Sequence, residues 1–255
     1  MKSLIDVFNE TIIKPDWESK SKKAPQFKIK PSMIGSSCER KIYYASAGVE
    51  EDYGFDLKGK KRMLLGDSIE TSLEKVFRKS GILIDYVNPD GTPHRKFGFA
   101  DVTTQFPVEC ADIYIKNGYI DAVCILDGKL WIADYKSINL NGFGGLLSAK
   151  NDHLIQTVIY LYIFNLMLAE GKFSHIEKLQ GFTKAEGVRI LYVNKDDTEM
   201  KEFTLTDTDA FFAQIVNKIM ATRKNYDTKT LPPKTPEFCN TCNWRDKCKK
   251  NFNIS

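Results

Sequence analysis

The chain has 255 residues, of which 42% are hydrophobic and 27% charged, a composition typical of a globular protein with a sizeable apolar core. A formal net charge of +4 and a pI near 8.6 permit a polyanionic partner without requiring one. The first residues do not form an apolar export signal, and the most apolar stretch, 154–169, is too short and too polar for a membrane span. We therefore expect a cytoplasmic protein whose six cysteines are thiols or metal ligands, not disulfides.

Composition divides the chain into three parts: a basic N-terminal arm (1–30), a core (31–230) and a cysteine-rich C-terminal segment (231–255) that begins with the break at Pro232 and Pro233. The lysines of the arm are Lys20, Lys22, Lys23, Lys28 and Lys30. They indicate either a solvated arm or an electrostatic contact with nucleic acid, and the sequence leaves both interpretations open.

The N-terminal half of the core is expected to be largely helical. A short helix is expected within 32–47, and irregular or hairpin structure over 85–105. Between them, the spacing of the apolar residues predicts a helix over 66–80, with Gly81 as its stop. Those apolar residues are Ile69, Leu73, Val76 and Phe77.

The centre of the chain has the signals of an antiparallel meander. Asn117–Gly118 and Asp127–Gly128 are two-residue turn sequences, and they predict strands over 106–116, 119–126 and 129–137. Further elements are expected to be a helix over 150–170, strands near 188–194 and 201–206, and a helix over 207–225.

The second turn sets the register of its hairpin. If Asp127 and Gly128 are the loop residues, Asp121 lies directly opposite Asp134. Facing side chains in an antiparallel pair are only about 4.5–5.5 Å apart at Cβ, so the two carboxylates repel each other unless a cation lies between them. Lys136 is two residues beyond Asp134 and shares its face of the sheet.

The rest of this hairpin is apolar on both faces, and a strand buried on both sides carries Asp and Lys only when they are paired or bind metal. An internal salt bridge between Lys136 and one aspartate explains the same residues and remains open.

Two helices offer further candidates. Gln156 and Tyr160 are four residues apart and share a helix face, although a polar residue beside an ordinary core tyrosine would look the same. Glu70 borders the apolar face of its helix. Asp67-x-x-Glu70 also has the spacing of a capping box, so Glu70 is either a metal ligand or a helix cap.

Cysteines mark both ends of the chain. Cys239, Cys242 and Cys248 fall within ten residues, and the residues between them are mostly polar. Core packing therefore does not explain these cysteines, whereas thiolate metal ligation does. Cys38 is the candidate fourth ligand, and the remaining two cysteines lie in apolar strands and are expected to be buried hydrophobes. The spacing does not separate Zn²⁺ from an iron–sulfur cluster.

Together these residues resemble the PD-(D/E)XK nuclease superfamily, and within it the RecB-like branch. The matching motifs, in order, are Gly66-x-x-x-Glu70, Gly118-x-x-Asp121, Asp134-Tyr135-Lys136 and Gln156-x-x-x-Tyr160. Glu70 stands where the branch usually has histidine and is similar to the glutamate of the phage lambda exonuclease type. The one-plus-three cysteine pattern resembles the iron–sulfur staple of CRISPR-associated RecB-like exonucleases and of the AddB nuclease domain.

The resemblance implies a restriction-endonuclease-like α/β fold. In it, helices flank a central mixed sheet of four or five strands, and a 4Fe–4S cluster joins the two terminal segments. It also implies that Glu70, Asp121, Asp134 and the carbonyl of Tyr135 hold Mg²⁺ or Mn²⁺. Lys136 would position or deprotonate the attacking water or stabilise the oxyanion, and Gln156 and Tyr160 would orient DNA or the lysine. The cluster ligands would be Cys38, Cys239, Cys242 and Cys248.

The implied function is a metal-dependent exonuclease that acts on DNA ends, with single strands favoured, in replication, recombination or repair. A phage or mobile-element origin fits because the chain lacks the phosphate-binding loop of a helicase motor. The expected setting is a bacterial or phage-infected cell, with DNA and a replication or recombination protein as partners. The alternative is a non-catalytic, metal-stapled DNA-binding accessory protein.

Overall fold

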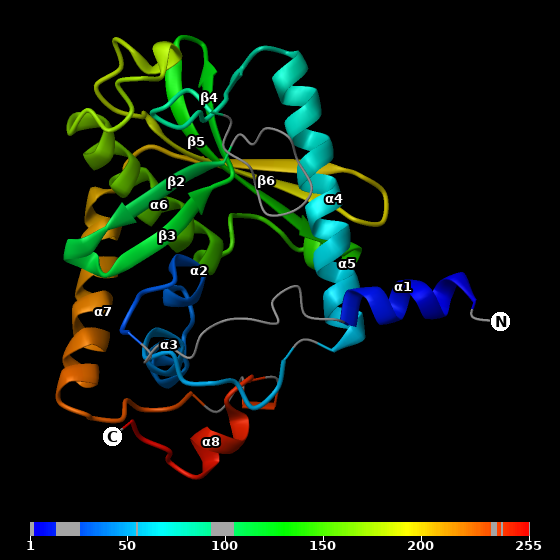
Figure 1. The fold of residues 1–255 in the computed structure, drawn as a ribbon, viewed down its shortest axis with the longest axis vertical. Helices are drawn as coiled ribbons and strands as arrows, with labels where there is room; N and C mark the ends of the chain where they lie inside the picture. Colours follow the sequence, from blue (N-terminus) through cyan, green and yellow to red (C-terminus); the bar gives the residue numbers. More distant parts are fainter. Residues whose placement is uncertain are drawn as a thin grey trace.

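In the computed structural model, described here for residues 3–13, 26–54, 56–92, 105–235, 239–240 and 242–254, helices flank a five-stranded sheet (Figure 1). The helices are α1 (Leu4–Ile13), α2 (Pro31–Ile34), α3 (Glu39–Ser46), α4 (Leu57–Lys79), α5 (Leu140–Gly144), α6 (Asn151–Ala169), α7 (Asp209–Asp227) and α8 (Arg245–Lys249), with 3-10 turns η1 (Ala111–Ile113) and η2 (Glu177–Leu179). The strands are β1 (Leu83–Ile84), β2 (Phe106–Cys110), β3 (Ile115–Ile120), β4 (Ala122–Leu126), β5 (Lys129–Ile138), β6 (Gly187–Asn194) and β7 (Met200–Leu205).

The main sheet has the strand order β1-β4-β5-β6-β7. Only β5 and β6 run parallel, and α6 lies in the connection between them, as a parallel crossover requires. The other neighbours are antiparallel. The prediction of a mixed sheet of four or five strands flanked by helices is confirmed.

The hairpin β4–β5 has the predicted register. Leu126 pairs with Lys129, and Ala122, which follows Asp121, pairs with Ala133, which precedes Asp134. The turn residue Asp127 has φ 50° and Gly128 has φ 73°, as a turn with two left-handed residues needs.

The first part of the predicted meander is wrong. The chain reverses at 111–114 through η1 and Tyr114, whereas Asn117–Gly118 lies inside β3 and is not a turn. β2 and β3 form a separate two-stranded sheet, in which Val108 pairs with Gly118, and the chain breaks at Asp121 before β4 begins. Asn117 has φ 57° and makes the strand irregular at this point. Gly118 has no side chain and lets β3 approach Val108 of β2 closely.

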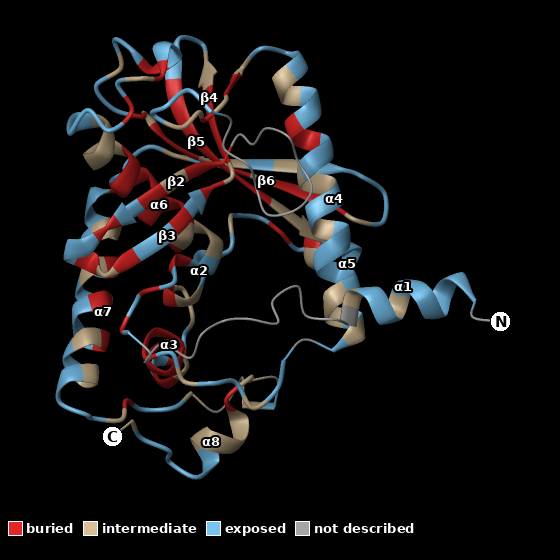
Figure 2. Ribbon diagram, in the orientation of Figure 1, coloured by how far each residue is buried: buried red, intermediate tan, exposed pale blue. Residues whose placement is uncertain are grey.

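Each face of the sheet is covered by one long helix. Leu73 of α4 packs with alternate sheet residues, including Trp131 and Tyr135, whereas α6 packs on the set that includes Val123 and Ile132. Figure 2 shows the central strands buried between these layers. Asp134 and Lys136 have the same alternation as Ile132 and therefore belong to the α6 face.

Helix α4 is longer than predicted. It begins at Leu57, nine residues before Gly66, and the Asp56 side chain caps it by accepting a 2.6 Å hydrogen bond from the Gly59 amide. The predicted stop is confirmed, because Ser80 ends the helix and Gly81 follows with φ 81°. The segment 32–47 contains two helices in place of one, α2 and α3, with Cys38 at the start of α3.

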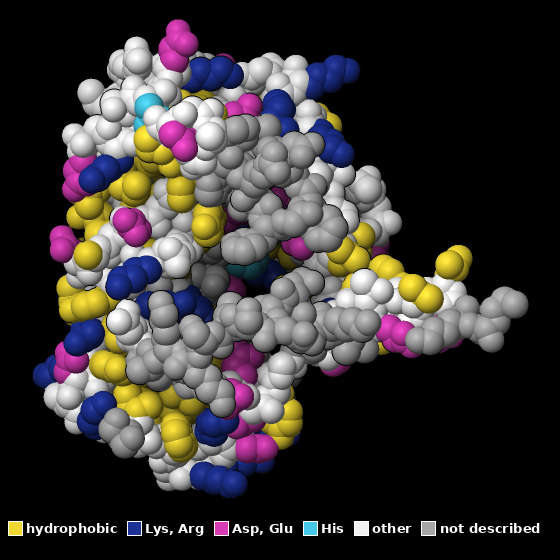
Figure 3. All heavy atoms as spheres, viewed as in Figure 1, with side chains coloured by type: hydrophobic (Ala, Val, Ile, Leu, Met, Phe, Trp, Pro, Cys, Tyr) yellow, Lys and Arg dark blue, Asp and Glu magenta, His cyan; other side chains and the backbone are white. Residues whose placement is uncertain are grey.

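Helices α6 and α1 both carry many apolar side chains but differ in how far these are buried. α6 is the one helix of the described chain whose length and hydropathy would allow a membrane span, but it serves here as the core helix, with Ile159, Ile163 and Phe164 fully buried. α1 projects from the body and exposes Leu4 and Ile5 (Figure 3). Lys20, Lys22 and Lys23 of the expected basic arm lie outside the described residues, so the role of that arm stays a prediction.

Two motif glycines differ in how much space surrounds them. A Cβ on Gly118 would lie 3.1 Å from the Val108 carbonyl oxygen and 3.3 Å from Cε1 of Tyr160. A Cβ on Gly66 would meet only Ser137 Oγ, at 3.4 Å. Gly118→Ala should therefore lower the free energy of unfolding by about 1–3 kcal/mol through overpacking. Gly66→Ala should be neutral or stabilising by about 0.5–1 kcal/mol, since alanine favours helix. Urea unfolding of both variants tests this, and equal destabilisation would contradict it.

A half-buried histidine joins α6 to β6. His153 Nδ1 lies 2.8 Å from the Tyr192 hydroxyl, and this hydroxyl also accepts a 3.0 Å hydrogen bond from the Lys150 amide. Burial lowers the pKa of His153 from 6.5 to about 4, helped by Lys136 and Lys150 and opposed by Asp152. His153 is therefore neutral in the folded protein over a pH range in which it is charged after unfolding.

This shift has a defined sign. Between pH 6.5 and 4 the unfolded chain binds a proton at His153 that the folded chain does not, so stability falls as the pH falls through this window. His153→Gln keeps a hydrogen-bonding group and removes the titration. It should recover about 2 kcal/mol of the loss between pH 7 and pH 4, after allowance for partial exposure of the ring. Urea unfolding at a series of pH values measures it, and identical slopes for variant and wild type would refute it.

Candidate active site

The two aspartates of the hairpin meet where β3 ends and β5 passes beside it. Asp121 Oδ2 accepts a 3.0 Å hydrogen bond from the backbone amide of Tyr135, which fixes its carboxyl against β5. Asp134 is 1% exposed, and its carboxyl lies close enough to that of Asp121 for a hydrogen bond when one of them is protonated. The structure therefore brings the two predicted carboxylates together.

Lys136 shares this face. Its Nζ lies 2.7 Å from Asp134 Oδ2, and its side chain is 20% exposed. The salt bridge that the sequence left open as an alternative therefore exists, but it supplies one cation to two adjacent carboxylates. It accompanies the carboxylate pair and does not replace it.

Helix α6 contributes the other predicted pair. Gln156 Nε2 donates to the Tyr160 hydroxyl at 3.4 Å, and the hydroxyl interacts electrostatically with both aspartates and with Lys136. Burial raises the pKa of Tyr160 to about 12, with the aspartates adding to the rise. The Tyr160 ring also lies against Gly118, which explains why a glycine stands three residues before Asp121.

Glu70 comes from α4. It accepts a 2.8 Å hydrogen bond from Gln105 Nε2, and its charge raises the pKa of both Asp121 and Asp134. The capping-box interpretation fails, because α4 starts at Leu57 and Asp67 is in its interior. Its role as a metal ligand stays a prediction.

The site has an excess of negative charge. Burial raises the pKa of Asp121 well above its usual value, and the charge of Asp134 raises it further, while Lys136 and the Tyr135 amide oppose the shift. Burial likewise raises the pKa of Asp134 against the effect of Lys136. For Lys136, burial would lower the pKa, but the two aspartates outweigh it and raise the pKa. The ammonium form of Lys136 is thus strongly favoured.

A divalent cation fits this donor set. Both carboxylate oxygens of Asp134 are buried; Oδ2 is paired with Lys136, and a hard cation prefers oxygens of this kind. Among the described residues, however, no three His, Cys, Asp or Glu side chains stand close enough to form a ready metal site. The two aspartates are in place, whereas Glu70 lies near them without completing a three-carboxylate group.

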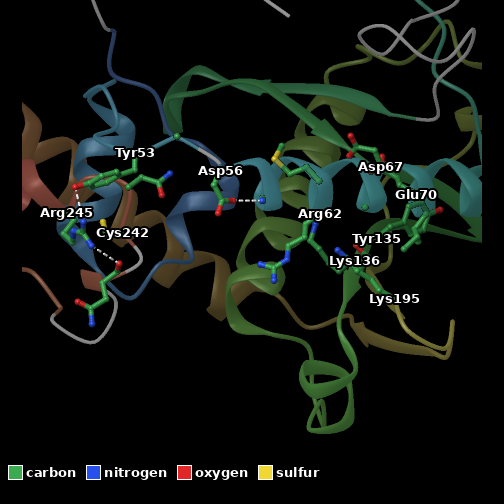
Figure 4. Close-up of a pocket in the computed structure, with 18 residues that line it drawn as sticks. Tyr53, Asp56, Arg62, Asp67, Glu70, Tyr135, Lys136, Lys195, Cys242 and Arg245 are labelled. Carbon is green, nitrogen blue, oxygen red and sulfur yellow. Dashed lines mark hydrogen bonds between the residues drawn. The ribbon is translucent and has the colours of Figure 1, made fainter. Parts of the chain in front are cut away.

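A groove of about 930 Å³ opens beside these residues (Figure 4). Glu70, Tyr135 and Lys136 line one end, and Tyr53 and Arg245 line the other, with α4 running along it. Its remaining charged lining residues are Arg62, Lys195, Asp56 and Asp67. The groove therefore connects the candidate active site with the cysteine-rich segment.

All four predicted cysteine ligands line a second, smaller cavity of about 50 Å³. These are Cys38, Cys239, Cys242 and Cys248. They are not close enough to count as a ready metal site, so the structure gathers them without showing a cluster. Cys110 and Cys124 are buried in strands, as predicted.

The cysteine segment is attached to the core by direct contacts as well. Trp244 packs with Tyr43 and Tyr44 of α3, and its Nε1 donates to the Val49 carbonyl at 2.8 Å. Arg40 Nε donates to the Pro232 carbonyl at 2.8 Å, and Lys247 lies 2.7 Å from Asp52. Arg40 and Lys247 therefore both help to hold this segment to the core.

Sequence patterns missed several residues of the site. Gln105 holds Glu70, and Tyr53, Arg62 and Lys195 line the groove, yet none belongs to a motif with a recognisable spacing. Arg62 alone had a signal, since it lies four and eight residues before Gly66 and Glu70 and so shares their helix face.

Comparison with known proteins adds the family. No curated protein matches the chain by sequence. Among solved structures, the crystal structure of SSO0001 superposes with a TM-score of 0.50 at 15% identity and covers 94% of each chain, a similarity of fold alone. A family model of the PD-(D/E)XK nuclease superfamily matches residues 57–249, a range that includes every predicted catalytic residue. Because that match spans well over half of the 255 residues, the chain belongs to the PD-(D/E)XK nuclease superfamily.

Proposed function

We propose that the protein is a metal-dependent DNA exonuclease of the RecB-like branch that favours single-stranded ends. The observation that carries the proposal is the pair of facing aspartates with Lys136 ion-paired to Asp134. A buried carboxylate pair with one lysine is costly for stability alone, whereas it suits binding of a divalent cation and a phosphate.

Each residue has a defined role in this proposal. Asp121 and Asp134, with Glu70 and the Tyr135 carbonyl, would hold Mg²⁺ or Mn²⁺. The bound ion would activate a water molecule and neutralise charge on the scissile phosphate. The Lys136 ammonium, anchored by Asp134, would donate to a phosphate oxygen, and Tyr160, oriented by Gln156, would position the lysine or the DNA backbone.

We further propose that the four cysteines hold a 4Fe–4S cluster. All four cysteines line one cavity. Their one-plus-three spacing along the chain resembles the iron–sulfur staple of RecB-like exonucleases, and this resemblance is our reason to propose the cluster before zinc. The cluster would be structural, because direct contacts already join its two supporting segments.

The biological setting belongs to the same proposal. DNA replication, recombination or repair in a bacterial or phage-infected cell is the setting we propose, with a protein of that machinery as partner. The rival function is a non-catalytic DNA-binding protein with the same staple. It predicts DNA binding without cleavage under any metal.

End-labelled single- and double-stranded DNA, incubated with Mg²⁺, Mn²⁺ or EDTA, tests the activity. Lys136→Ala and Asp134→Asn should each lower the cleavage rate about 10²- to 10⁴-fold. The first removes the ammonium that would contact the phosphate, and the second removes a charged ligand of the metal ion. Lys129→Ala is the matched control, since Lys129 lies on the same strand and pairs with Glu186 at the surface. Unchanged cleavage by Lys136→Ala would overturn the assignment of the active site, and absence of cleavage by the wild type would favour the rival.

Metal analysis tests the cysteine proposal. Protein purified without oxygen should contain about four iron atoms and four sulfides per chain and absorb visible light. Cys242→Ala should lose both signals, whereas Cys124→Ala should keep them, because Cys124 is buried in β4 away from this cavity. One zinc ion per chain and no iron would exclude the iron–sulfur cluster.

A further inference from the structure

The groove described above ends, away from the catalytic residues, at an aromatic side chain held in a fixed orientation. Tyr53 is 43% exposed and lines the groove. The guanidinium carbon of Arg245 lies 4.9 Å from the centre of its ring, and Arg245 Nη2 donates to the Tyr53 hydroxyl at 3.0 Å. The hydroxyl also hydrogen-bonds to the carboxylate of Asp246.

The backbone around Tyr53 is held as firmly as its ring. The amides of Asp52 and Tyr53 both donate to the Asn243 carbonyl, at 2.8 and 3.2 Å. The Asp52 carboxylate accepts hydrogen bonds from the amides of Asp246 and Lys247 at the start of α8. These contacts fix a ring that stays partly exposed, so burial of apolar surface alone does not account for its orientation.

Two cationic side chains lie along the groove between this ring and the active site. Arg62 and Lys195 both line it, and within the described chain neither forms an ion pair. Figure 4 places Arg62 beside α4 between the two ends, and Lys195 near Lys136. Glu70 lies fourteen positions after the cap residue Asp56, so the groove extends about 20 Å along the helix.

We propose that Tyr53, backed by Arg245, is a stacking platform for an unpaired base of the DNA strand, and that Arg62 and Lys195 contact the phosphates between the platform and the catalytic lysine. This inference rests on the proposed nuclease function and names the feature that selects single strands. A base inside a duplex has both faces covered by its neighbours, whereas an unpaired base has a face free to stack on a side chain. Tyr53 is thus a positioning residue, and its contribution to binding depends on the base.

Oligonucleotide binding by the full-length protein in the Lys136→Ala background separates these roles. Tyr53→Leu should weaken binding of a single-stranded oligonucleotide about 10- to 100-fold and leave blunt duplex binding unchanged. Tyr53→Phe, which keeps the ring and loses the hydroxyl contacts, should retain most of the single-strand affinity. Lys195→Ala should weaken binding of both DNA forms and reduce the slope of log affinity against log salt by about one, whereas Tyr53→Leu should leave that slope unchanged.

A substrate change tests the same contact without altering the protein. When Tyr53 is present, a single-stranded oligonucleotide with consecutive abasic sites should bind more weakly than the intact oligonucleotide. The Tyr53→Leu variant should bind the abasic and the intact oligonucleotide with the same, weaker affinity. With the catalytic lysine restored, Tyr53→Leu should raise KM for single strands while kcat is kept.

The outcomes are distinct. Equal loss in Tyr53→Phe and Tyr53→Leu, or a fall in melting temperature that parallels the loss of binding, would assign Tyr53 a structural role and overturn the platform. Equal single-strand affinity of Tyr53→Leu and its parent would overturn it as well, and would leave the nuclease assignment intact. If the wild type cleaves no DNA but the base-dependent binding is observed, the proposed catalysis fails and the platform stands.

Discussion

The facing carboxylates of Asp121 and Asp134 are the constraint on which the rest of the site depends. The hairpin register brings them together, and burial makes their mutual repulsion expensive. One lysine cannot neutralise both, so the arrangement is stable only if other elements hold it: the Tyr135 amide on Asp121, and the layers of α4 and α6 on either face of the sheet. A divalent ion bound between them would convert this repulsion into two attractive contacts, which is the physical basis of the metal site that we propose.

The break between β3 and β4 follows from this constraint. An uninterrupted strand would continue the ladder through Asp121 and commit its neighbours to regular pairing. Instead β3 pairs with β2 in its own small sheet, and Asp121 stands at the junction with its side chain bonded to the backbone of β5. Gly118 lets β3 approach Val108 and Tyr160 closely, so the motif glycine shapes the wall of the site, while the motif aspartate supplies its charge.

Local patterns predicted those parts of the molecule that local physics determines. The Asp127–Gly128 turn fixes its hairpin whatever surrounds it, so the opposition of Asp121 and Asp134 and the position of Lys136 were accessible from sequence. The Asn117–Gly118 pair was misread, because positive φ and a missing side chain serve an irregular strand as well as a turn. The start of α4 was missed because its first two turns are polar and exposed and lack apolar periodicity. Only tertiary packing brings Gln105 to Glu70 and brings Tyr53 and Lys195 to the groove, and no spacing in the sequence encodes it.

The cysteine-rich segment and the active site are linked through one loop. Residues 49–54 hydrogen-bond to the segment around Trp244 and then lead into α4, whose cap is Asp56 and whose interior carries Glu70. A change that detaches the segment should therefore also loosen the start of α4, the helix that lines the groove and carries Glu70. Since the loop includes Tyr53, the same contacts that hold the segment also orient the ring at the far end of the groove. The attachment of the C-terminal segment and the orientation of the Tyr53 ring are, on this geometry, two consequences of one set of hydrogen bonds.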